Sequence, residues 1–113
     1  MKKTPKKPIS MVQIRKKTGH YEGLTKQALE IISLEKDLNL REKKIAADFL
    51  EMAQNYFADA QYFKQENDWL TALAAFSYAH AWLDAGVRAG YLNGQNNNQL
   101  FVLPKAKTLE MLK

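Results

Sequence analysis

Apolar residues recur every three or four positions in three stretches of the chain, which is the spacing of one face of an α-helix. In the first stretch, residues 21–38, the apolar stripe consists of Leu24, Ala28, Ile31, Ile32 and Leu38. Lysine and glutamate residues lie off this stripe, and Asn39 favours a break after it. We therefore predict a first helix over about residues 21–38.

The second stretch, residues 40–65, has the longest regular pattern. Its apolar face steps through Ile45, Phe49, Met52, Tyr56, Ala60 and Phe63, while the amino-terminal part carries charged residues on the opposite side. At 1.5 Å per residue, a helix of this length would extend for about 39 Å.

The third stretch, residues 68–91, follows a short polar break. Asp68 is a suitable N-cap, because its carboxylate can accept hydrogen bonds from the first free amides of a helix. Gly90 favours the left-handed conformation that ends helices. Since the break is short, the second and third helices should form an antiparallel hairpin, with Tyr56 beside Tyr78 or Ala79. These three main helices predict an all-α, compact up-down bundle.

The remaining segments divide the chain into a bundle and two extensions. Residues 1–20 contain prolines and a glycine among lysines and are predicted to form a flexible basic arm. Within the arm, residues 9–14 are apolar enough to pack as a short strand or an extra helical turn. The bundle domain spans 21–103, ending in a polar turn and an extended segment, and 104–113 form a tail or short helix.

The composition narrows the class of protein. The chain has 113 residues and 13.0 kDa, which fits one domain. It has no cysteine, which excludes disulfides and thiolate metal sites. No apolar run approaches the ~20 residues of a membrane span, and no apolar segment typical of a secretory signal follows the basic amino terminus. We expect a cytoplasmic protein without membrane contact.

The net charge of +5 is concentrated near the amino terminus. Residues 1–17 contain no acidic residue and seven basic ones, namely Lys2, Lys3, Lys6, Lys7, Arg15, Lys16 and Lys17. These side chains could neutralise phosphates and give salt-sensitive, nonspecific nucleic-acid binding. No aromatic residues lie between the lysines to stack on bases, so base-specific recognition is not indicated. The alternative is a tail that only increases solubility.

Two groups of polar residues are candidates for chemistry. His80, Asp84 and Arg88 follow each other at intervals of four, on one side of the third helix, and Asp48 is expected to face them. In the structural interpretation, an Asp84–Arg88 ion pair joins the two helices through Asp48, and His80 is bonded to a neighbour. In the functional one, Asp84 orients His80 as a base, or the two bind a metal. Two ligands are only half of a metal site, so we favour the structural interpretation.

Asp59 is the second candidate, because it lies among apolar residues of the second helix. A carboxylate in such surroundings needs a partner, which the hydroxyl of Tyr56, Tyr62 or Tyr78 would supply. We expect a buried hydrogen bond; acid–base chemistry is the alternative. No catalytic residue, cofactor or metal ligand is predicted.

Two sequence segments resemble the archaeal family catalogued as domain of unknown function 357. They are Tyr56-x-x-Asp59-Ala60-x-x-Phe63 and Tyr78-Ala79-His80-x-Trp82-Leu83-Asp84-Ala85-Gly86. The resemblance covers about residues 24–103 and implies a compact, cytosolic helical bundle with no established activity. It transfers no functional residues to this chain.

The sequence therefore predicts a non-enzymatic interaction or adaptor module. Its bundle would bind an unknown protein partner or a second copy, and its basic arm would add weak nucleic-acid affinity. Exposed aromatic residues (Tyr62, Trp82 and Tyr91) are one possible contact patch. The alternative is a small-ligand or catalytic pocket around Asp59, His80 and Asp84.

Overall fold

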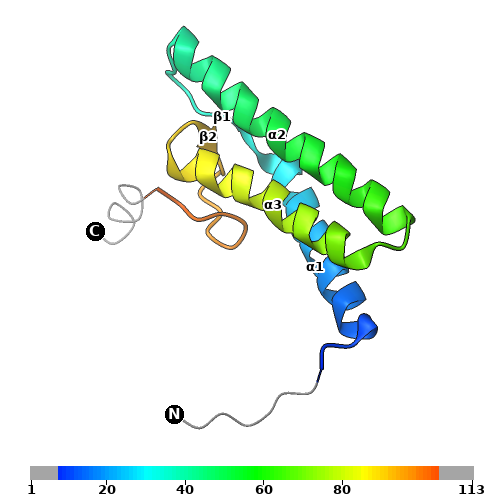
Figure 1. The fold of residues 1–113 in the computed structure, drawn as a ribbon. Helices are drawn as coiled ribbons and strands as arrows, with labels where there is room; N and C mark the ends of the chain where they lie inside the picture. Colours follow the sequence, from blue (N-terminus) through cyan, green and yellow to red (C-terminus); the bar gives the residue numbers. More distant parts are fainter. Residues whose placement is uncertain (1–7, 105–113) are drawn as a thin grey trace, which may run out of the picture.

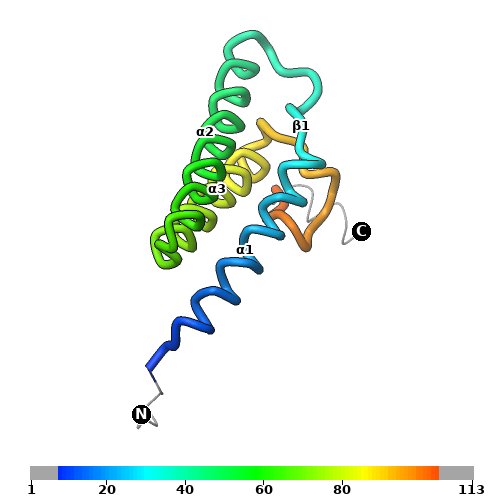
Figure 2. Tube along the Cα trace, turned by 90° about the vertical axis from the view of Figure 1, so that its right-hand side faces the viewer, coloured from blue at the N-terminus to red at the C-terminus, as the bar shows by residue number. Residues whose placement is uncertain are grey.

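The computed structural model describes residues 8–104 and consists of three helices and one short strand pair (Figure 1). The helices are α1 (Met11–Ile31), α2 (Leu40–Gln65) and α3 (Trp69–Arg88). The strands are β1 (Ser33–Leu34) and β2 (Leu92–Asn93). Helices α2 and α3 run side by side, and α1 packs mainly against α3, which makes α3 the central helix (Figure 2). The predicted all-α, up-down bundle is confirmed.

Helix α1 begins ten residues earlier than predicted, so the assignment of residues 11–20 to a flexible arm was wrong. The helix starts with a capping box, in which the Gln13 amide donates to Ser10 Oγ and the Ser10 amide donates to Gln13 Oε1. This pairing satisfies two amides that the first turn would otherwise leave free. Gly19 does not interrupt the helix.

Helix α1 also ends earlier than predicted, at Ile31 instead of residue 38. The chain turns extended at Ile32, and β1 then pairs antiparallel with β2, with Ser33 opposite Asn93 and Leu34 opposite Leu92. The backbone groups of residues 33–35 therefore form hydrogen bonds with the segment around β2, and not with the preceding turn of a longer helix.

The α2–α3 hairpin agrees closely with the prediction. Asn67 adopts a left-handed conformation (φ 61°) at the end of α2, and the Asp68 side chain accepts from the Thr71 amide at the start of α3. The Tyr56 and Tyr78 rings lie 4.5 Å apart between centroids. Tyr56 and Tyr78 lie at equal distances in sequence before and after the turn at Asn67. Their contact therefore confirms that α2 and α3 are antiparallel.

The carboxyl end of α3 is fixed by two glycines. Gly90 (φ 85°) ends the helix as predicted, with the Tyr91 amide donating to the Gly86 carbonyl. A Cβ atom on Gly86 would lie 2.4 Å from Leu92 Cδ1, so only glycine allows β2 to approach the helix this closely.

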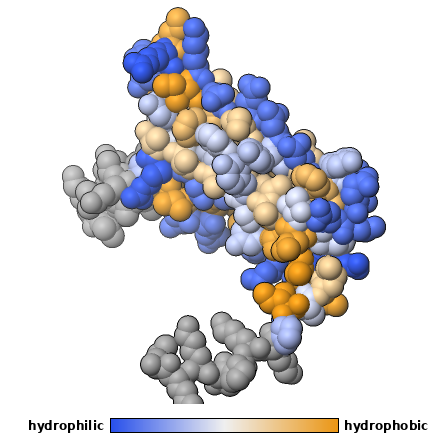
Figure 3. All heavy atoms as spheres, viewed as in Figure 1, coloured by the Kyte–Doolittle hydropathy of each residue, from blue (hydrophilic) through white to orange (hydrophobic). Residues whose placement is uncertain are grey.

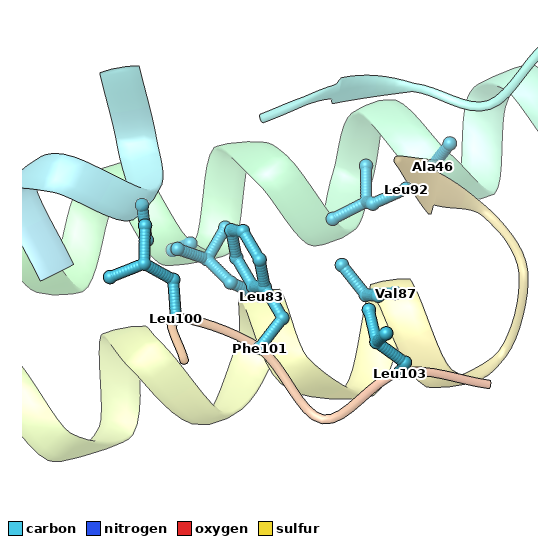
Figure 4. Close-up of a cluster of buried hydrophobic side chains, with 9 residues drawn as sticks. Ala46, Leu83, Val87, Leu92, Leu100, Phe101 and Leu103 are labelled. Atoms are coloured by element: carbon cyan, nitrogen blue, oxygen red, sulfur yellow. The ribbon is translucent and has the colours of Figure 1, made fainter. Parts of the chain in front are cut away.

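The core is divided into two clusters along α3. The larger cluster lies near β2, where buried residues of α3 and β2 meet segment 100–103 (Figure 4). Its members in the close-up are Ala46, Leu83, Val87, Leu92, Leu100, Phe101 and Leu103. The smaller cluster lies near the α2–α3 turn and centres on Phe76, packed on Ala60 and Ala72. Segment 100–103 thus packs into the larger core cluster of the bundle.

Candidate functional site

His80 is the only histidine in the core among the described residues, and it is 8% exposed. Its Nε2 lies 2.6 Å from the Leu100 carbonyl oxygen, and its Nδ1 lies 3.1 Å from Thr25 Oγ1. Because a carbonyl oxygen can only accept, Nε2 carries a hydrogen. In the neutral ring Nδ1 then accepts from the Thr25 hydroxyl. Both ring nitrogens are therefore engaged in bonds that join α3 to α1 and to segment 100–103.

Asp84 and Arg88 continue the same row along α3. Asp84 Oδ1 accepts a hydrogen bond from the Val102 amide at 3.0 Å, and Arg88 donates to the Leu103 carbonyl at 3.1 Å. Asp84 also lies 3.9 Å from His80 Nε2. We call His80, Asp84 and Arg88 the α3 clamp, since each holds a main-chain group of segment 100–103. We predicted that these residues would stabilise the fold by joining α3 to α2. In the structure they join α3 to the main chain of segment 100–103 instead.

The structure does not bring Asp48 into this row. Asp48 is exposed on α2, and no ion pair within residues 8–104 joins it to Arg88 or joins Arg88 to Asp84. The predicted Asp84–Arg88 ion pair that would join the two helices through Asp48 was therefore wrong. The Arg88 side chain instead donates to the Leu103 carbonyl, which follows the Leu100 carbonyl held by His80 and the Val102 amide held by Asp84.

Asp59 is also exposed, and the prediction of a buried bond to a tyrosine hydroxyl was wrong. Its neighbours on the sequence, Phe57 and Ala60, turn toward α3, whereas Asp59 lies on the water-facing side of α2. In the described part of the chain, no group of three metal-binding side chains comes together. Asp59 thus faces solvent on α2, whereas His80 and Asp84 bind segment 100–103.

An uncharged, mostly apolar face of the described surface lies on α3, on the side opposite its core residues. We call Leu70, Ala74, Tyr78, Ala81 and Ala85 the α3 outer face; all five are exposed. Leu70 is 65% and Tyr78 is 52% exposed, and Val102 beside the clamp is 53% exposed. Figure 3 shows apolar and weakly polar residues over α3, bordered by strongly polar ones along α2.

A groove of about 260 Å³ crosses this face between two aromatic rings. It is lined by the rings of Tyr78 and Trp82 and by the small residues Ala81 and Ala85. The Trp82 ring is held by an edge contact with Phe49, at 5.2 Å between centroids, and Tyr78 by Tyr56. Both rings are therefore held by contacts with α2. From the sequence, Tyr78 was expected only as a neighbour of Tyr56 in the hairpin. This face was not predicted, although the alanines opposite the core residues of α3 gave a signal for it.

Of the basic residues predicted to contact nucleic acid, those that the structure describes lie on the first turns of α1. Arg15, Lys16 and Lys17 are exposed, and the Arg15 guanidinium lies over the Trp69 ring at 5.2 Å from its centroid. Lys16 and Lys17 line a shallow hollow of about 300 Å³ together with Ile9 and Gln13. Lys2, Lys3, Lys6 and Lys7 lie outside the described residues.

The fold and this geometry define a class of protein: an all-α bundle whose candidate polar residues either hold its own backbone or stand apart on the surface. No helix within residues 8–104 is long and apolar enough to cross a membrane. The chain belongs to the family described as "Protein of unknown function (DUF357)", whose model matches residues 20–92. This match confirms the resemblance seen in the sequence. No curated protein and no solved structure matches the chain.

Proposed function

We propose that the protein is a non-enzymatic, cytoplasmic interaction module that binds an apolar helix of a protein partner along the α3 outer face. The observation that carries this proposal is the contrast between α3 and its neighbour. The exposed side of α2 carries charges such as Lys43, Lys44 and Glu51, whereas the α3 outer face carries none. A helix that is apolar on both sides is typical of one that is covered on both sides.

The state of the polar residues supports a binding role over a catalytic one. His80 and Asp84 would be the base and its orienting group in a pocket, but both are used to hold segment 100–103. Moving them to a substrate would leave the Leu100 carbonyl and the Val102 amide without partners. The groove on α3, in contrast, is lined almost entirely by apolar atoms and therefore favours an apolar ligand.

A matched pair of charge insertions tests this proposal. We expect Ala81→Glu, in the lining of the groove, to abolish capture of a partner from a lysate of the source organism, because it would bury an unpaired carboxylate at the contact. Ala58→Glu is the control, since Ala58 is also exposed but lies on α2. Identical captured proteins for the wild type and both variants would refute the proposal.

The basic amino-terminal region supports a second, weaker binding activity toward nucleic acid. Arg15, Lys16 and Lys17 lie within one turn of α1 and face solvent, and four further lysines precede them in the sequence. Because α1 begins at Met11, a deletion through residue 17 would remove part of the bundle. A truncation that tests this activity should therefore stop at residue 8.

We expect Lys16→Gln/Lys17→Gln to weaken binding of a duplex DNA and to reduce the slope of log K against log salt by about 2. The control is Lys43→Gln/Lys44→Gln, which removes the same charge from exposed positions of α2. Fluorescence anisotropy at several salt concentrations measures both. Equal losses in the two double variants would show that only net charge matters and would contradict a site on α1.

A further inference from the structure

We infer that the helix covering the α3 outer face is α3 of a second copy, in an antiparallel, two-fold symmetric dimer. This inference rests on the proposed function, because it names the occupant of the same face. Ala74, Tyr78, Ala81 and Ala85 follow each other at intervals of four, three and four residues. Alternating intervals of three and four residues are typical of the contact line between two packed helices. Among the described elements, no helix covers this face of α3.

The face is complementary to itself. Its one large side chain, Tyr78, needs a small residue opposite, and its alanines leave room for a helix at about 8 Å. If a two-fold axis passes level with Ala81 and Trp82, Tyr78 of one copy lies over Ala85 of the other, inside the groove. The same operation places Ala74 opposite Ala89, which is exposed as well. A two-fold contact forms each of these pairs twice.

The charges agree with the antiparallel direction. Arg88 is the nearest charged residue beyond the carboxyl end of the face, and it lies about seven residues from the axis. At 1.5 Å per residue the two copies of Arg88 are then about 20 Å apart, which exceeds the screening length of about 8–10 Å in physiological salt. Antiparallel helices also place opposite ends of their dipoles side by side. In a parallel, in-register pair, Tyr78 would meet Tyr78.

The size of the face determines how strong the dimer is. Helix α3 has 20 residues and is therefore about 30 Å long. With a helix width of about 10 Å, the contact covers several hundred Å² per copy, less than the roughly 800 Å² of a standard interface. We expect a weak dimer, with a dissociation constant of roughly 10⁻⁵–10⁻³ M.

Sedimentation equilibrium between about 10 μM and 1 mM spans this range of dissociation constants and tests the dimer. The average mass should rise from 13.0 kDa toward twice that value. Ala85→Glu should weaken the association at least tenfold, and Ala58→Glu should leave it unchanged. A wild-type protein that stays monomeric throughout overturns the dimer. Partner capture that Ala81→Glu still abolishes would then leave the proposed function intact, so the two failures can be told apart.

Disulfide trapping tests the orientation, and the chain has no cysteine of its own to interfere. Ala81→Cys lies at the axis and should form a covalent dimer on mild oxidation. Ala74→Cys lies about 10 Å from the axis, so its two copies would be about 20 Å apart, too far for the 4.4–6.8 Å between the Cα atoms of a disulfide. Trapping of both variants would indicate parallel helices, and trapping of neither would overturn this contact.

Discussion

Replacement of Phe76 by alanine is expected to lower the free energy of unfolding by about 3–5 kcal/mol. Phe76 is fully buried at the centre of the smaller core cluster, and its ring packs on Phe57 at 5.4 Å between centroids. The surrounding side chains include Ala60 and Ala72, which are too small to fill the space left behind. A loss of this size is a large part of the roughly 5–15 kcal/mol by which domains are stable.

Urea denaturation followed by circular dichroism measures this change, with Leu70→Ala as the control. Leu70 lies on the same helix but is 65% exposed, so the same kind of truncation should cost less than about 1 kcal/mol at a low protein concentration. A cost below about 1 kcal/mol for Phe76→Ala would contradict the packing of α2 against α3 that the ring contacts describe.

The second large effect is expected from His80→Leu. The substitution removes the bonds to Thr25 and to the Leu100 carbonyl, and it leaves that carbonyl buried without its partner. We expect a loss of about 2–4 kcal/mol, since each unsatisfied buried group costs about 1–3 kcal/mol. Segment 100–103 should loosen at the same time, which faster hydrogen exchange of the Val102 amide would report.

Two further variants separate the bonds of His80. His80→Gln keeps an N–H that can donate to Leu100 and should recover part of the stability. Thr25→Val removes only the hydroxyl, and its effect should nearly vanish in the His80→Leu background, because the bond is already lost there. Additive effects of His80→Leu and Thr25→Val would contradict the bond between these side chains.

The hairpin was predictable because its signals are local. The apolar steps through Tyr56 and Phe63 give the face of α2, and Asp68 and Gly90 give the ends of α3. The ends of α1 were not predicted, for two different reasons. Its start depends on the capping box of Ser10 and Gln13, which lies ahead of the apolar periodicity. Its end depends on pairing with β2, about 60 residues away, for which residues 33–34 carry no visible signal.

In the candidate site, too, the local arrangement was predictable and the distant contacts were not. The spacing of His80, Asp84 and Arg88 correctly placed them in one row on α3. Their partners in segment 100–103 are main-chain amide and carbonyl groups. Every residue except proline has both groups, so the side chains of this segment gave no signal that predicts the contact. Asp59 was misplaced because a residue at the border of a helical stripe can face either way. Burial of its neighbours, which only the fold decides, turned it outward.

The pairing of β1 with β2 has a consequence for the order of folding. Helices α2 and α3 meet through residues close in sequence, so their association requires only a small loop to close. Strand β2 follows α3 directly and reaches β1 only after the chain has reversed at Asn67. We therefore expect the α2–α3 hairpin to form first, as the folding nucleus. Helix α1 would dock onto it afterwards, and the β1–β2 pair would form last.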